Sequence, residues 1–148
     1  MMLSVDGLAG APLAVRVASY NPGLFSRTQD GSGPGAILHG DATPVTSDRS
    51  ARPGEPVSLY ATGLGAVDNR PDTGKAASSL LLSNTLTRPA VSIGGRDAVV
   101  GFSGLAPGFV GLYQVNVIVP TDLMTDEHPV VLNIGGVSSN TVKLPIRQ

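Results

Sequence analysis

The sequence contains two histidines, His39 and His128, and they limit the acid–base chemistry that it could support. A serine hydrolase needs a nucleophile, a base and an orienting acid within hydrogen-bond reach of one another. The run from Gly101 to Leu105 (GFSGL) begins like a nucleophile elbow, but Leu105 stands where the last glycine belongs, and no strand-to-helix turn is predicted there. We therefore interpret this run as a false match. The two histidines are not spaced as a zinc pair, and we expect both to be solvated loop residues.

Acidic residues give two further candidates. Asp126 and Glu127 are adjacent and precede Pro129, which predicts a turn with solvated charges. A glycosidase would need two carboxyl groups about 5–10 Å apart across a cleft. The segment Asp68–Gly74 offers oxygen ligands for calcium, but it lacks the alternation and the closing glutamate of an EF-hand loop, so calcium binding there is only a weak hypothesis.

Phosphate and thiolate chemistry find little support. The glycines from Gly31 to Gly35 lack the Lys-Ser/Thr ending of a phosphate-binding loop, and turn geometry explains them better. The absence of cysteine excludes a disulfide scaffold, a thiolate zinc site and a cysteine nucleophile. We therefore predict no catalytic, cofactor-binding or metal-binding residue, no cofactor, and a protein that is not an enzyme.

Composition and charge limit the kinds of partner that the chain could bind. The chain has 148 residues with 10 basic and 11 acidic side chains, a formal net charge of -1, and 19 Gly and 12 Pro residues. This balance gives no field that would gather nucleic acid or anionic lipid. The apolar runs are too short to span a bilayer, and the first residues do not resemble a secretion signal, so we expect a fragment of a larger protein without membrane insertion.

Sugar binding is an alternative to a purely structural role. Carbohydrate-binding modules stack sugars on exposed aromatic rings, and this sequence has no Trp. Tyr20, Tyr60 or Phe109 could serve if they lie on a sheet face or at a loop tip. A carbohydrate-binding module therefore stays open as the alternative function.

Apolar residues that alternate with polar ones predict the strands that would position these side chains. We expect strands over residues 56–62, 111–119, 130–134 and 141–146, with a weaker one at 13–18 and a short apolar piece at 36–38. Val57, Leu59 and Ala61 would share one face of the first of these strands, and Val142, Leu144 and Ile146 would face inward in the last.

Glycine pairs and Pro-Gly dipeptides mark the turns. Gly94-Gly95 and Gly135-Gly136 each lie between β-branched runs and predict tight hairpins. Asn21-Pro22-Gly23 has the order of a type II turn. Residues 63–86 form the longest stretch without periodicity, in which Lys75–Leu82 could form one or two helical turns.

Many short strands with turns between them favour an all-β protein built as a two-sheet sandwich. Gln114 and Asn116 face away from Val115 and Val117 in their strand. We expect these two amides to hold the backbone of the long loops, with ligand recognition as the alternative, and we predict that Asn116→Ala lowers stability by about 1–3 kcal/mol.

Six blocks occur in one order and carry a resemblance to a known family. The blocks are Tyr20–Phe25 (YNPGLF), Ala51–Glu55 (ARPGE), Leu59–Gly65 (LYATGLG), Val91–Gly95 (VSIGG), Gly111–Val117 (GLYQVNV) and Gly135–Asn140 (GGVSSN). Together they resemble the uncharacterised C-terminal domain family of exported proteins from Solibacter and other Acidobacteria, over roughly residues 12–146. That family is similar to the IPT/TIG group of immunoglobulin-like modules.

The resemblance implies an immunoglobulin-like sandwich over residues 19–148 and an extracellular or cell-surface location. The implied role is non-catalytic, in attachment, spacing or assembly within a larger exported protein. Residues 1–18 would carry an additional strand, which could be the last strand of a preceding module. Such an edge strand would pair with this sandwich or with another copy of the chain, so the expected partners are neighbouring domains, other copies or a polysaccharide.

Overall fold

The computed structural model describes residues 2–148, and within them the protein is all-β, with no helix. Because there is no helix in this range, none is long and apolar enough to cross a membrane. The strands are β1 (Ser4–Val5), β2 (Leu8–Ala9), β3 (Gly23–Leu24), β4 (Ile37–His39), β5 (Pro56–Thr62), β6 (Ala90–Ile93), β7 (Arg96–Leu105), β8 (Tyr113–Ile118), β9 (Asp126–Ile134), β10 (Val137–Ser138) and β11 (Val142–Ile146).

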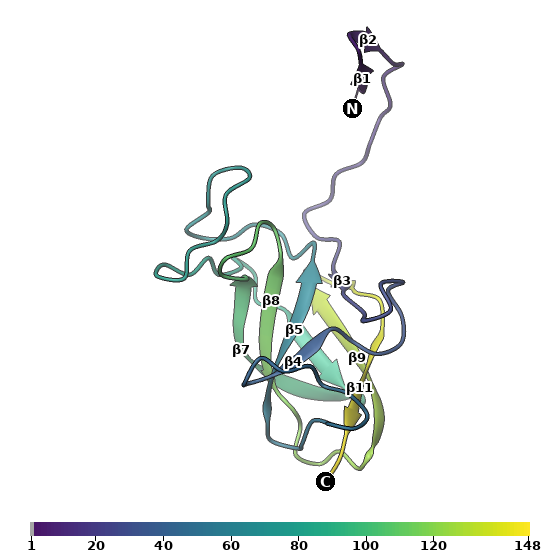
Figure 1. The fold of residues 1–148 in the computed structure, drawn as a ribbon, viewed down its shortest axis with the longest axis vertical. Helices are drawn as coiled ribbons and strands as arrows, with labels where there is room; N and C mark the ends of the chain where they lie inside the picture. The colour runs from purple at the N-terminus through teal and green to yellow at the C-terminus, as the bar shows by residue number, and fades with distance from the viewer. Residues whose placement is uncertain (1) are drawn as a thin grey trace.

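One antiparallel sheet of nine strands curls into two layers (Figure 1). Strand β7 passes from one layer to the other, since residues 96–98 pair with β6 and residues 99–105 pair with β8. Its register shifts between Val100 and Phe102, and a bulge of this kind bends a strand. Strands β6, β9, β10 and β11 therefore form one layer, while β8, β5, β3 and β4 form the other. The predicted sandwich-like architecture is confirmed at this level.

Parallel contacts close the opposite side of the curled sheet. The backbone N–H of Gly35 donates to Lys143 O (2.9 Å), and Lys143 N–H donates to Gly33 O (2.7 Å). Further along β11, Ala51 N–H donates to Pro145 O (3.0 Å) and Arg147 N–H donates to Ala51 O (2.9 Å). The outer edge of β11 is thus covered by segments that precede β5 in the chain.

The core follows the alternation that the sequence predicts. One cluster of buried side chains joins the two layers, and its largest fully buried members include Leu59, Leu64, Ile93, Leu132, Ile134, Leu144 and Ile146. Strand β5 runs over the predicted residues 56–62, and Val57, Leu59 and Ala61 are all buried. The inward face of β11 is confirmed as well, because Val142, Leu144 and Ile146 are buried.

Both predicted Gly-Gly hairpins are confirmed. Gly94 and Gly95, with φ of +59° and +74°, connect β6 to β7, and Gly135 and Gly136, with φ of +59° and +80°, connect β9 to β10. Two consecutive positive φ angles are what the tightest hairpin turn requires. A third hairpin, β1–β2, turns at Asp6 and Gly7, which also have positive φ.

The helical turns expected over Lys75–Leu82 are wrong. Ser78 Oγ accepts hydrogen bonds from the N–H groups of Leu80 and Leu81, as a helix cap would, but no helix follows. The backbone of Ala77 instead bonds to the 106–109 loop, through Ala77 N–H to Phe109 O and Gly108 N–H to Ala77 O. Pairing with this neighbouring loop takes the place of helical hydrogen bonds.

Two predicted turns are also wrong. Gly23 begins β3 opposite Thr62 and does not have a positive φ, while Gly63 takes the left-handed conformation (φ +72°) and its carbonyl accepts the Asn21 N–H. Asp126 and Glu127 open β9 rather than forming a turn, because β11 pairs with them. In both places a partner that is distant in sequence decides the conformation.

The N-terminal segment lies apart from the sandwich (Figure 1). It contains the β1–β2 hairpin, and residues 10–18, which include the strand predicted at 13–18, are assigned to no strand. Side chains from Met2 to Ala18 are exposed.

Candidate functional site

The predicted false match at Ser103 lies inside strand β7. The Ser103 hydroxyl is buried and shares a hydrogen bond with Thr85 Oγ1 (2.9 Å). Gly104 faces the backbone of Ser83 so closely that a Cβ there would lie 2.2 Å from Ser83 O. Gly104 and Ser103 therefore serve the packing of the 83–85 segment against β7.

His128 is part of strand β9 and is not a loop residue, which corrects the expectation. Its Nε2 lies 2.8 Å from the carbonyl oxygen of Met124. A Cβ on Gly94 would lie 2.6 Å from the Nδ1 atom, so the imidazole packs directly against the β6–β7 hairpin. This histidine therefore supports a turn.

Two of the acidic candidates, Glu127 and Asp68, have side-chain partners in the fold. Glu127 accepts a hydrogen bond from Lys143 Nζ (3.2 Å). Asp68 accepts from the backbone N–H (2.5 Å) and the side-chain amide of Asn84, and so fixes the loop that was considered for calcium. No group of three or more His, Cys, Asp and Glu side chains that could hold a metal ion occurs within residues 2–148.

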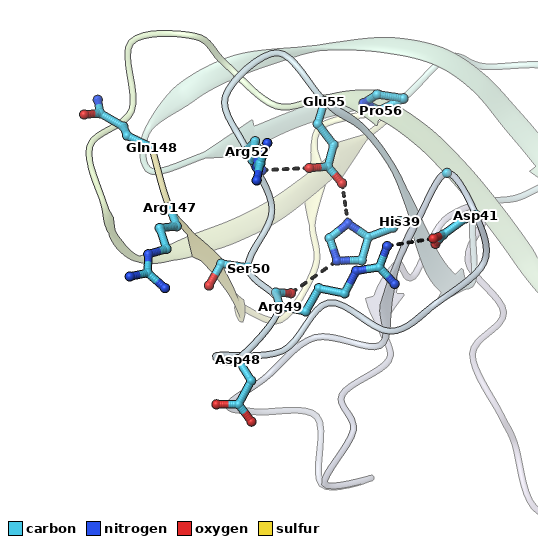
Figure 2. Close-up of a pocket in the computed structure, with 11 residues that line it drawn as sticks. His39, Asp41, Asp48, Arg49, Ser50, Arg52, Glu55, Pro56, Arg147 and Gln148 are labelled. Atoms are coloured by element: carbon cyan, nitrogen blue, oxygen red, sulfur yellow. Dashed lines mark hydrogen bonds and ion pairs between the residues drawn. The ribbon is translucent and has the colours of Figure 1, made fainter.

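The other histidine, His39, is buried at the end of β4, which also corrects the expectation of a solvated loop residue. Its Nδ1 contacts Glu55 Oε1, and its Nε2 lies 3.2 Å from Arg49 O (Figure 2). Glu55 is presented by a turn in which Gly54 has φ +82°, Glu55 N–H donates to Arg52 O (3.1 Å), and Glu55 Oε2 accepts the Arg52 N–H (2.8 Å).

Both ring nitrogens of His39 are held by oxygen atoms, Nδ1 by the Glu55 carboxylate and Nε2 by the carbonyl of Arg49. His39 and Glu55 thus form a buried imidazole–carboxylate pair that joins β4 to the start of β5.

An ion pair lies beside this imidazole–carboxylate pair. Arg49 Nη2 donates to Asp41 Oδ2 (2.7 Å), and Asp41 Oδ1 accepts from Thr43 Oγ1 (2.6 Å) and Thr43 N–H (3.1 Å). The hydrogen bond from the Thr43 hydroxyl, followed by that from Arg49, holds the pKa of Asp41 well below its usual range. Asp41 is therefore ionised at neutral pH.

These two pairs line a polar hollow of about 700 Å³ (Figure 2). It includes Arg147 and Gln148 and so lies at the end of the molecule where the C-terminus is marked in Figure 1. The remaining lining includes Asp48, Ser50, Arg52, Arg147 and Gln148. Sequence reasoning missed this site. The signal that could have found it is the Arg52-Pro53-Gly54-Glu55 run, because Pro-Gly predicts a type II turn that brings residues 52 and 55 together.

A second surface carries the amides of β8. The Asn116 Oδ1 atom accepts from Ser58 Oγ (3.0 Å) and from Gln114 Nε2 (2.8 Å). The expectation that these amides hold the long loops is therefore wrong, since their partners lie on β5 and β8 themselves. The cross-strand register places Tyr60 opposite Gln114 and Phe102 opposite Asn116 on the same outer face.

The aromatic candidates for sugar binding have different surroundings. Tyr20 is held in the fold, with its OH 2.8 Å from Thr87 Oγ1 and its ring against Gly65 and Gly135. Tyr60 is half-buried on the outer face of β5. Phe109 is exposed in the loop between β7 and β8. Only Tyr60 and Phe109 are therefore placed where a ring could meet a ligand.

In comparisons with known proteins, no family model, no curated protein and no solved structure matches the chain. The candidate function consequently depends on the geometry of the fold and of its polar hollow.

Proposed function

We propose that this chain is a non-catalytic, immunoglobulin-like β-sandwich module of a larger exported protein, acting in attachment, spacing or assembly at the cell surface. The observation that carries the proposal is the path of the chain. It enters the sandwich at one end and leaves at the other, so neighbouring modules would be joined in line (Figure 1).

The register of β5 supports this path. Gly23, near the point of entry, pairs with Thr62 at the end of β5, while Ala51, just before the start of β5, pairs with Ile146 at the end of β11. The seven residues of β5 separate these two points by about 20 Å at the usual rise per residue. A module of this shape adds length to a chain rather than folding it back.

The contacts of β11 suit a chain under tension. Four backbone hydrogen bonds join β11 to residues 33–35 and 51 in parallel pairing. A pull on the two ends of the sandwich would slide these parallel segments past each other, so that the bonds share the force rather than open one after another. Such an arrangement favours a spacer that stays folded when its ends are pulled.

The immunoglobulin-like class is the finer part of the proposal. It is supported by the sandwich-like layers. It is also supported by the turns and close backbone contacts that residues of the six resembling blocks form. Gly63, in the block after β5, has a positive φ, and a Cβ there would lie 2.0 Å from Asn21 O. The Val91–Gly95 block contains the tight turn of the β6–β7 hairpin.

Force spectroscopy on a chain of these modules, pulled through residues 19 and 148, tests the spacing role. Lys143→Pro removes the N–H that donates to Gly33 O, and we expect it to lower the unfolding force. Lys143→Ala is the matched control, because it removes the side chain and its ion pair with Glu127 but keeps the N–H. Equal unfolding forces for the parent and the proline variant would contradict the proposal.

A carbohydrate-binding module is the second candidate, favoured by the outer face of β5 and β8. There Tyr60 and Phe102 flank Gln114 and Asn116, two side-chain amides that could bond to sugar hydroxyls. Loss of affinity for a neutral polysaccharide in Tyr60→Ala, with the melting temperature unchanged, would support this candidate. Equal affinity in that variant would exclude this face.

A further inference from the structure

Two arginines at the polar hollow come from neighbouring backbone segments. Ala51 and Ile146 are neighbours in a parallel bridge, and Arg147 N–H donates to Ala51 O (2.9 Å). Both Ala51 and Ile146 point into the core. Because side chains alternate along extended backbone, the next residues, Arg52 and Arg147, both point outward, and both are exposed at the hollow (Figure 2).

Two of the three acidic side chains that line the hollow with these arginines already have partners. Asp41 is paired with Arg49, and Glu55 is paired with His39, which leaves Asp48 as the third. The guanidinium groups of Arg52 and Arg147 form no ion pair and no hydrogen bond within residues 2–148. Two like charges on adjacent segments therefore have no ion-pair partner within the described residues.

An oxyanion would resolve this arrangement. Guanidinium groups bind carboxylate, sulfate and phosphate oxygens through paired N–H donors, and one such anion can bridge two arginines. The His39–Glu55 and Arg49–Asp41 pairs line the same hollow. The first requirement on a ligand is thus a negatively charged group.

The size and the remaining lining of the hollow set the second requirement. A space of about 700 Å³ exceeds what one small anion needs, and Asp48, Ser50 and Gln148 add neutral and acidic hydrogen-bonding groups around the arginines. Asp48 would repel a second negative charge but would accept hydrogen bonds from hydroxyl groups. A ligand that combines one anionic group with several hydroxyls fits both features.

We propose that this hollow binds an acidic polysaccharide. The carboxylate or sulfate group of the polysaccharide contacts Arg52 and Arg147, and its hydroxyls contact Asp48 and Ser50. This inference rests on the proposed function, since it names what an attachment module would attach to.

Calorimetric titration of the whole chain tests the site with four probes: polygalacturonate, dextran sulfate, neutral dextran and free sodium sulfate. We expect binding to a charged polymer, no binding to neutral dextran, and weaker binding by free sulfate. The two polymers separate a carboxylate ligand from a sulfate ligand, and preference for either one supports the proposal. Affinity should fall as salt is raised, because the contact is between charges.

Variants place the binding at the two arginines. Arg52→Gln and Arg147→Gln should each weaken binding about tenfold, and the double variant should weaken it about a hundredfold, as loss of charge-assisted hydrogen bonds predicts. Arg70→Gln is the matched control, since Arg70 is exposed on the loop between β5 and β6. All variants should melt at the temperature of the parent protein, because these side chains have no partner in the fold.

Several outcomes would overturn the site. These are binding to none of the probes, an equal loss in Arg70→Gln, equal affinity for neutral dextran, or free sulfate binding as tightly as the polymers. The force measurement is independent of all of them, because it depends on the backbone bonds of β11. Failure of the polysaccharide site would therefore leave the spacing role standing, and the reverse also holds.

Discussion

The two glycines of the β9–β10 hairpin should respond very differently to alanine. Gly135 and Gly136 both have positive φ, so a side chain at either position is strained. A Cβ on Gly135 would also lie 2.4 Å from two ring carbons of Tyr20, whereas a Cβ on Gly136 would meet nothing within 4 Å. The pair therefore separates backbone strain from a steric clash within one turn.

The magnitudes follow from these two contributions. The left-handed conformation costs about 1–2 kcal/mol for a residue with a Cβ, and this cost applies to both variants. Overpacking adds about 1–3 kcal/mol at Gly135 alone. The ring of Tyr20 cannot move away, because Gly65 packs against its opposite edge and its OH bonds to Thr87. Gly135→Ala should therefore cost about 2–5 kcal/mol, against about 1–2 kcal/mol for Gly136→Ala.

Urea denaturation of both variants measures these costs as changes in the free energy of unfolding. Tyr20→Ala, combined with Gly135→Ala, completes a double-mutant cycle. Removal of the ring should abolish the extra cost at Gly135 and leave only the backbone strain. Equal losses in the two single glycine variants, or an additive double variant, would refute the argument that Tyr20 is clamped between the two turns.

Four further outcomes are expected. Asn140→Ala should lower stability by about 1–3 kcal/mol, because its side-chain amide bonds to both the N–H (2.7 Å) and the carbonyl oxygen (3.0 Å) of Leu24 and holds β3 in place. Asn116→Ala should cost only about 1 kcal/mol, since water can replace its hydrogen bonds at the outer face. Urea denaturation measures both losses, and a larger loss for Asn116→Ala than for Asn140→Ala would contradict the role of Asn140 in holding β3. Acid should destabilise the fold as pH falls from about 4 toward about 2. The hydrogen bond from the backbone N–H of Ser32, followed by those from nearby hydroxyls, lowers the pKa of Asp30 to about 2. The stability that ionised Asp30 contributes is therefore complete above its unfolded pKa of about 4 and is lost as pH falls through its folded pKa. Asp30→Asn should flatten this part of the stability profile, and an unchanged profile would contradict it. Deletion of residues 1–18 should leave the melting temperature of the sandwich unchanged, because their side chains are exposed, and a change in mass measured by light scattering would show whether this segment joins copies of the chain.

Short sequence patterns correctly predicted the strands and turns whose conformation is decided within one short segment. The alternation in β5 gave its bounds and its buried face, and the glycine pairs gave two hairpins, because one short segment contains the whole signal in each case. The Asp6-Gly7 dipeptide is the same kind of signal, and it is typical of the tight turn that joins β1 to β2. Errors arose at Gly23 and at Asp126, where a strand distant in sequence supplies the partner.

The candidate site could not have been assembled from the sequence in this way. Its arginines lie on neighbouring segments only because Ala51 and Ile146 pair, although 94 residues separate them in the sequence. The pairing is parallel, and no periodicity in either segment predicts which residues will pair. The role assigned to Asn116 illustrates the same limit, since the amide that fixes a distant strand is Asn140. The sequence predicted that a side-chain amide would hold a distant backbone segment, but it did not show which asparagine lies within hydrogen-bond distance of that segment.

The polar hollow and the closure of the sandwich share the same backbone. The hydrogen bond from Arg147 N–H to Ala51 O is one of the four that hold β11 and its C-terminal end in parallel pairing. Arg147 donates this bond, and Arg52 directly follows the residue that accepts it. An anion bridging the two guanidinium groups would therefore add a cross-link beside the bonds that a pull must break. Because such a ligand binds the folded state and not the unfolded chain, saturating polygalacturonate or dextran sulfate should raise both the melting temperature and the unfolding force. In the double variant of Arg52 and Arg147 neither quantity should respond to the polymer, and a rise in force that persists in that variant would place the contact elsewhere.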